Sequence, residues 1–94
     1  MKSIIAAALI AFAPVAAMAD TPDVAFCSSF GVLMENVAAA RDAGVPFADT
    51  VSFLRDAGAE YAVETAARVY LAGHLSPSEV AALVTVACLD AKAI

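Results

Sequence analysis

The sequence predicts an all-α fold, a compact four-helix domain closed by one disulfide and preceded by a cleaved signal peptide. Apolar residues recur at helical spacings of three and four between Asp23 and Ala91, and no segment shows the period of two that is typical of strands. Glycines and prolines stand where helices would end or begin. Cys27 and Cys88 are the only cysteines, so only one intramolecular pairing exists.

The N-terminal segment, residues 1–19, has the three parts of a secretory signal peptide. Lys2 supplies the positive start, residues 4–15 form the apolar stretch, and residues 17–19 (Ala-Met-Ala) form a small-x-small cleavage site. The apolar run is shorter than the roughly 20 residues needed to span a bilayer, which favours cleavage over a membrane anchor. We therefore expect a mature domain of residues 20–94 that is periplasmic or secreted and has no membrane span after cleavage.

In an exported chain, a pair of cysteines normally forms a disulfide. A bond between Cys27 and Cys88 would close a loop of about 61 residues and would stabilise the fold by about 4 kcal/mol through the entropy of the unfolded chain. The spacing does not match the Cys-x-x-Cys motif of a redox site. The bond would bring the beginning of the first helix to the end of the last, so we expect these two helices to pack antiparallel.

The first helix is expected over residues 23–43, because Thr21 can cap it and Pro22 suits a first helical position. Gly44 would end this helix in a left-handed cap. Its predicted buried face consists of two adjoining stripes. The stripes are Phe26, Phe30, Leu33, Val37 and Ala40, and beside them Cys27, Gly31, Met34 and Ala38.

The second helix is expected over residues 47–57, because Val45-Pro46 turns the chain before it. Gly58 either caps its end or lets the chain bend into the third helix. Its predicted buried face consists of Phe47, Val51 and Leu54. The third helix is expected over residues 59–72. Its predicted inward side chains are Val63, Ala66, Ala67, Tyr70 and Leu71. Both helices are short, so each depends on packing against the others.

The last helix begins with the strongest local signal, because residues 76–79 (Ser-Pro-Ser-Glu) form a capping box with proline at the first helical position. The helix should continue to Ala91. Its predicted core-facing side chains are Val80, Leu83, Val84, Ala87 and Cys88.

This last helix is apolar nearly all round, because Val86 and Leu89 lie off its core face. Four short helices cannot bury such a helix completely, and exposed apolar surface often marks an interaction site. We expect Val86, Leu89 and Ala82 to form a surface for a protein partner or for a second copy of the chain. The alternative is that Ala81 and Ala82 make this extra face only weakly apolar, so that it binds no partner.

The aromatic side chains belong either to the core or to a ligand site. The six in question are Phe26, Phe30, Phe47, Phe53, Tyr61 and Tyr70. Core packing is the simpler interpretation. If the protein carries an apolar ligand, we expect Phe30, Phe53 and Tyr70 to line its site between the helices.

No residue pattern indicates catalysis, a metal site or a cofactor. His74 is the only histidine, and it lies in a predicted loop, where polar surface is its expected role; an enzyme would need a carboxylate or serine within hydrogen-bond reach of it in a cleft. The net charge is −5, and loss of Lys2 makes the mature chain more acidic, which argues against nucleic acid as a partner.

The order of Cys27, the Arg-Asp-Ala-Gly-Val-Pro run at residues 41–46, Val69-Tyr70 and Cys88 resembles small exported two-cysteine helical proteins of proteobacteria and their phages. That group has no established activity, so the resemblance implies a structural framework and transfers no catalytic residue. A looser similarity is to periplasmic acid-stress chaperones and to helical periplasmic immunity proteins.

These observations predict a non-enzymatic periplasmic interaction protein of the inhibitor, immunity, chaperone or assembly-subunit type. It would act through the apolar surface of its last helix, with a protein partner still to be identified or as a homodimer. The alternative is a small periplasmic carrier of an apolar ligand.

Overall fold

The computed structural model describes residues 22–93, and within them the chain forms four α-helices and one short 3₁₀ turn. The elements are α2 (Pro22–Asp42), α3 (Phe47–Asp56), η1 (Glu60–Ala62), α4 (Val63–Leu71) and α5 (Pro77–Ala93). The predicted all-α class is confirmed, and the third predicted helix begins as the η1 turn. The expected signal peptide, residues 1–19, and the expected cap Thr21 lie outside the described residues.

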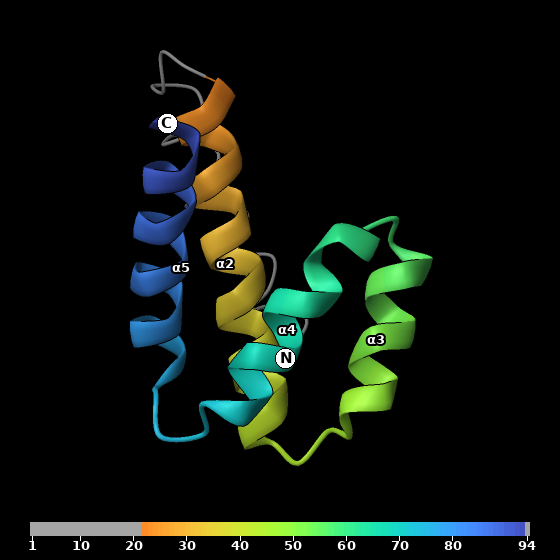
Figure 1. Ribbon diagram of the computed structural model, residues 1–94. Helices are drawn as coiled ribbons and strands as arrows, with labels where there is room; N and C mark the ends of the chain where they lie inside the picture. Colours follow the sequence, from red (N-terminus) through yellow and green to blue (C-terminus); the bar gives the residue numbers. More distant parts are fainter. Residues whose placement is uncertain (1–21, 94) are drawn as a thin grey trace, which may run out of the picture.

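An antiparallel pair formed by α2 and α5 is joined by the predicted disulfide. The Cα atoms of Cys27 and Cys88 are 5.5 Å apart, so the beginning of α2 (orange in Figure 1) lies next to the end of α5 (dark blue). Gly31 lets the two helices approach closely. A Cβ atom at Gly31 would lie 2.9 Å from the carbonyl oxygen of Ala81 and would overlap the hydroxyl of Thr85.

The core lies where α2 meets α3, α4 and one side of α5. Its buried members are Met34, Val37, Ala38, Leu54, Ala59, Ala62, Ala66, Val69 and Val80. Of the two stripes predicted on α2, the one that contains Cys27 and Met34 is fully buried, whereas Phe26 in the other stripe is exposed. The core therefore consists mostly of small and medium-sized side chains.

Two leucines with predicted core positions are exposed instead. Leu71 has 87% of its surface exposed because it is the last residue of α4 and points away from Val69, which faces the core. Leu83 is 56% exposed. It lies on the side of α5 that faces α4, but α4 packs mainly on α2 and α3 and leaves this side of α5 uncovered.

The side chain of Arg41 fastens the end of α2 to the end of α4. Only 8% of this side chain is exposed. Its Nη1 donates to the carbonyl oxygens of Val69 at 2.8 Å and Ala72 at 3.0 Å, and its Nη2 donates to the carbonyl oxygen of Leu75 at 2.6 Å. The last carbonyl groups of a helix lack partners within the helix, and a guanidinium group supplies them here.

Tyr70 of α4 makes further hydrogen bonds, to the loop after α2 and to α3. Its hydroxyl donates to the carbonyl oxygen of Val45 at 2.9 Å and is 2.7 Å from Oγ1 of Thr50. Because the tyrosine proton goes to Val45, the buried threonine hydroxyl is the donor in the second bond. The run of residues 41–46 and the Val69-Tyr70 pair, which are far apart in the sequence, are therefore direct partners in the fold.

Local signals at the helix ends are confirmed by the backbone. Gly44 has φ of 86° and Gly58 has φ of 77°, the left-handed conformation that glycine adopts after a helix. At the start of α5, the backbone N–H of Ser76 donates to Oε1 of Glu79 at 2.9 Å, and the N–H of Glu79 donates to Oγ of Ser76 at 3.2 Å. This reciprocal pair is the predicted capping box.

Candidate functional site

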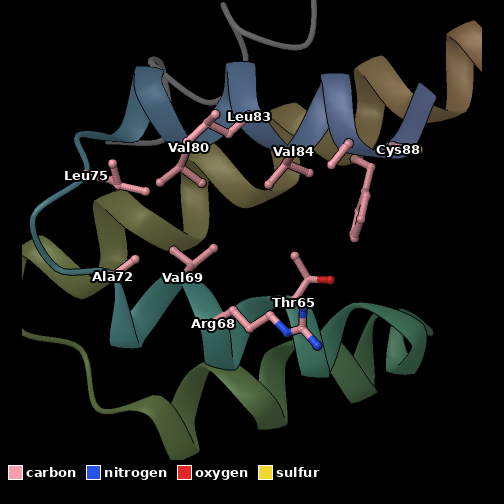
Figure 2. A pocket seen from close by; sticks show the side chains of 11 residues that line it. Thr65, Arg68, Val69, Ala72, Leu75, Val80, Leu83, Val84 and Cys88 are labelled. Atoms are coloured by element: carbon pink, nitrogen blue, oxygen red, sulfur yellow. The ribbon is translucent and has the colours of Figure 1, made fainter. Parts of the chain in front are cut away.

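An apolar groove lies between α4 and α5. Its volume is about 420 Å³, and Figure 2 shows side chains of α4 and α5 facing one another across it. The lining comes from Phe30 on α2, from Thr65, Arg68, Val69 and Ala72 in and after α4, from Leu75 in the loop, and from Val80, Leu83, Val84, Ala87 and Cys88 on α5. Thr65 and Arg68 are the polar side chains of this lining.

The groove exists because α4 and α5 are each held by α2 rather than by one another. The disulfide and the Gly31 contact hold α5 against one side of α2. Arg41 holds the C-terminal end of α4 against the end of α2. The loop between Ala72 and Ser76 joins the two helices at one end of the groove, and the rest of α4 turns toward α3.

The edge of the groove formed by α5 combines exposed apolar and acidic residues. Leu83 lines the groove, whereas Val86, three residues later and 57% exposed, lines a separate hollow that α5 forms with α2. Glu79 and Asp90 are exposed and lie four residues before Leu83 and four residues after Val86. These four residues follow one side of α5 at helical spacing, and we call them the α5 edge.

The edge formed by α4 carries an ion pair. Nη2 of Arg68 lies 3.0 Å from Oε1 of Glu64, and both side chains are mostly exposed. This is the favourable pair expected from their spacing of four residues. Because the carboxylate already neutralises the guanidinium, the α4 edge adds no net positive charge to the groove.

The residues predicted for a partner surface, Ala82, Val86 and Leu89, share one side of α5 at positions i, i+4 and i+7, and they differ in exposure. Val86 and Ala82 are exposed, and together with Val32 of α2 they border a shallow hollow on the other side of α5 from the groove. Leu89 is half-buried and lines neither the groove nor this hollow. Leu83, which the spacing pattern assigned to the core, is instead the exposed apolar residue of α5 that lines the groove.

The aromatic residues predicted to line a ligand site are not brought together. Phe30 lines the α4–α5 groove. Phe53 is 64% exposed and borders a different hollow, between α2 and α3. Tyr70 packs on Phe47 with ring centres 5.1 Å apart, and its hydroxyl is engaged by Val45 and Thr50. Tyr70 is therefore a structural residue here.

The partners of the titratable side chains in residues 22–93 include exposed ion pairs and the helix cap at Ser76. His74 is exposed in the loop between α4 and α5. The hydrogen bonds from Ser76 are the main cause that lowers the pKa of Glu79, and His74 is the smallest of the contributions. Glu60 pairs with Arg55, whose Nε lies 3.0 Å from Oε1. Within the described range, no three histidine, cysteine or acidic side chains are placed to hold a metal ion.

The described residues also contain no helix that is long and apolar enough to cross a membrane. The fold and the groove define a class of small, disulfide-closed four-helix domain. No protein family, curated protein or solved structure matches the chain. The resemblance to exported two-cysteine helical proteins stays a prediction.

The groove could not be found from the sequence because each wall comes from a different helix. The available signal was the excess of apolar residues on α5, which indicated exposed apolar surface on that helix. The sequence could not indicate the second wall, which includes Val69 and Ala72, because this wall depends on the position of α4 relative to α5.

Proposed function

We propose that this protein is an exported, non-enzymatic interaction protein that binds an apolar segment of a partner protein in the groove between α4 and α5. The observation that carries the proposal is the groove itself, lined mainly by apolar side chains and bordered by the exposed Leu83. Concave apolar surface of this kind is typical of binding sites, and leaving it uncovered costs free energy.

Export is supported by the signal-peptide pattern of residues 1–19 together with the disulfide between Cys27 and Cys88. A disulfide is consistent with an oxidising compartment outside the cytoplasm. The proposed location is therefore the periplasm or the extracellular space.

A partner segment fits the groove better than an enclosed small ligand. A volume of about 420 Å³ lies within the range of small-molecule sites. Carriers, however, surround most of the ligand surface, whereas this groove is partly open to solvent rather than enclosed. An amphipathic helix can bury its apolar edge in a single open groove. Recognition of a helix by a groove is a recurrent mode of peptide binding.

The experiment is a titration of the ¹⁵N-labelled, oxidised protein with a designed neutral peptide. The peptide is an 18-residue helix with leucine on one side and glutamine and alanine on the others. We expect backbone shift changes concentrated at the groove, around Val69, Val80 and Val84. Leu83→Ser should weaken binding by about tenfold, because an exposed leucine that becomes buried contributes roughly 1.5–3 kcal/mol.

Leu71→Ser is the matched control, because Leu71 is also an exposed leucine but does not line the groove. We expect this variant to bind the peptide as the wild type does. Failure of the peptide to bind, or shift changes on the α2–α5 side, would overturn the proposal. Tight binding of the neutral fluorophore N-phenyl-1-naphthylamine in the groove, without binding of the peptide, would support the carrier alternative instead.

A further inference from the structure

Resting on the proposed function, we infer that the partner segment is a basic amphipathic helix, with lysine or arginine on both sides of a short apolar edge. The inference comes from the α5 edge, where the exposed carboxylates of Glu79 and Asp90 flank Leu83, the exposed apolar residue that lines the groove. The apolar groove favours a ligand with an apolar edge, and the carboxylates near both ends of its α5 side favour a ligand with positive charge at both ends. A basic amphipathic helix has both properties.

The acidic charges of the α5 edge are not neutralised by the arginines of the chain. Arg41 is buried against backbone carbonyl groups and Asp42. Arg55 pairs with Glu60, and Arg68 pairs with Glu64 on the opposite edge of the groove. These are all the arginines of the sequence. A partner that brings its own cations would therefore find two exposed carboxylates that none of the arginines pairs with, although that of Glu79 also accepts from the N–H of Ser76.

The spacing of the α5 edge indicates the size of the partner segment. Glu79 and Asp90 are eleven residues apart in one helix, which corresponds to roughly 16 Å along its axis. The apolar wall between them, from Val80 to Cys88, is a little over two turns long. A partner helix with apolar residues at positions i, i+4 and i+7 would fill this length, with a cationic residue near each end.

Long basic side chains suit this edge for a second reason. The aliphatic parts of lysine and arginine can lie along exposed apolar surface such as Leu83 while the charged groups reach Glu79 or Asp90. A second copy of this chain fits less well, because its own α5 edge would place carboxylates against carboxylates, and the chain carries a net charge of −5.

The test compares two fluorescein-labelled 18-residue peptides by fluorescence anisotropy with the oxidised protein. Both have the same leucine edge, and the other positions carry lysine in one peptide and glutamate in the other. At low ionic strength we expect the lysine peptide to bind at least tenfold more tightly. The ratio should fall several-fold at 0.5 M salt, because screening weakens attraction between exposed charges.

The decisive variant is the double substitution Glu79→Gln with Asp90→Asn. Glutamine at position 79 preserves the capping box while it removes the charge. We expect this variant to lose most of the preference for the lysine peptide. The matched control is Asp49→Asn with Asp56→Asn, which removes two charges from α3, away from the groove, and should keep the preference.

Three results would overturn the inference. Equal affinity for both peptides, still weakened by Leu83→Ser, would leave the proposed groove function intact and exclude a basic partner. A lysine preference that falls equally in the α3 control would show attraction to the whole acidic protein rather than to the α5 edge. A concentration-dependent dimer in sedimentation, abolished by Leu83→Ser, would make a second copy the occupant.

Discussion

The guanidinium group of Arg41 lies 2.8 Å from the carbonyl oxygen of Val69, across 28 positions of sequence. With its bonds to Ala72 and Leu75, this contact sets where α4 ends and how it sits on α2. The groove depends on that placement, because Val69 and Ala72 form part of one wall. Arg41 is thus a structural determinant of the candidate site although it does not line it.

Replacement of Arg41 by alanine should therefore destabilise the fold strongly. Three carbonyl groups would lose a charged donor in a part-buried setting, for an expected loss of about 2–4 kcal/mol in the free energy of unfolding. Arg41→Lys should lose at least half as much, because one ammonium group cannot match the planar fork of guanidinium donors. Urea denaturation of both variants measures the effect.

Arg68→Ala is the control for that experiment, because its pair with Glu64 is exposed. Exposed ion pairs contribute little, so we expect a change of at most about 0.5 kcal/mol. A loss of less than 0.5 kcal/mol for Arg41→Ala would contradict the structural role assigned to Arg41.

Gly31→Ala should also destabilise the protein, although alanine favours helix by about 1 kcal/mol over glycine. The added methyl group would meet Thr85 and the carbonyl oxygen of Ala81, and α5 would have to move away from α2. We expect a net loss of about 1–3 kcal/mol. Gly73→Ala is the control, since nothing lies within 4 Å of a Cβ atom at Gly73. A Gly31→Ala variant as stable as the wild type would show that the helices are not in close contact there.

The disulfide should provide a large share of the stability. It joins residues 61 positions apart, and removing such a cross-link costs about 4 kcal/mol by the chain-entropy relation. The double variant Cys27→Ser/Cys88→Ser should melt roughly 15–30 °C lower in a domain of this size. A reducing agent should lower the melting temperature of the wild type alone. Equal melting temperatures of oxidised wild type and double variant would disprove this role.

The free energy of unfolding should decrease at acid pH because Glu79 becomes protonated. The N–H of Ser76 is the main cause that lowers the pKa of Glu79 below its ordinary value of 4.5, followed by the Ser76 side chain and the charge of His74. An acid whose pKa is lower in the folded state stabilises the fold when it is ionised. The contribution is therefore present above the unfolded pKa, near 4.5, and is lost as the pH falls through the lower folded pKa.

Glu79→Gln tests this pH dependence, because glutamine retains the capping geometry but does not titrate. The free energy of unfolding of the wild type should decrease more steeply than that of the variant below pH 4.5. Parallel profiles for the two proteins would show that the capping carboxylate does not couple folding to pH.

The helix ends and the disulfide were predictable because their signals are local or unique. Gly44 and Gly58 have the positive φ expected of them, residues 76–79 form the expected capping box, and a single pair of cysteines has one pairing. None of these features depends on how the helices are arranged in space.

The candidate site was not predictable in the same way. Leu83 shares the helical face of buried Val80, so spacing alone assigns both to the core. Whether Leu83 is covered depends on the position of α4, which the contacts of Arg41 and Tyr70 set over long sequence distances. The arginine carries no hydrophobic pattern, so its role in shaping the groove appears only in the structure.

The central claim is that the groove beside Leu83 binds an apolar helix with basic flanks. The most direct measurement is the affinity of the leucine–lysine peptide for three forms of the oxidised protein: wild type, Leu83→Ser and Leu71→Ser. We predict about tenfold weaker binding for Leu83→Ser only. Equal affinity for all three forms, or equal losses in both variants, would contradict the claim.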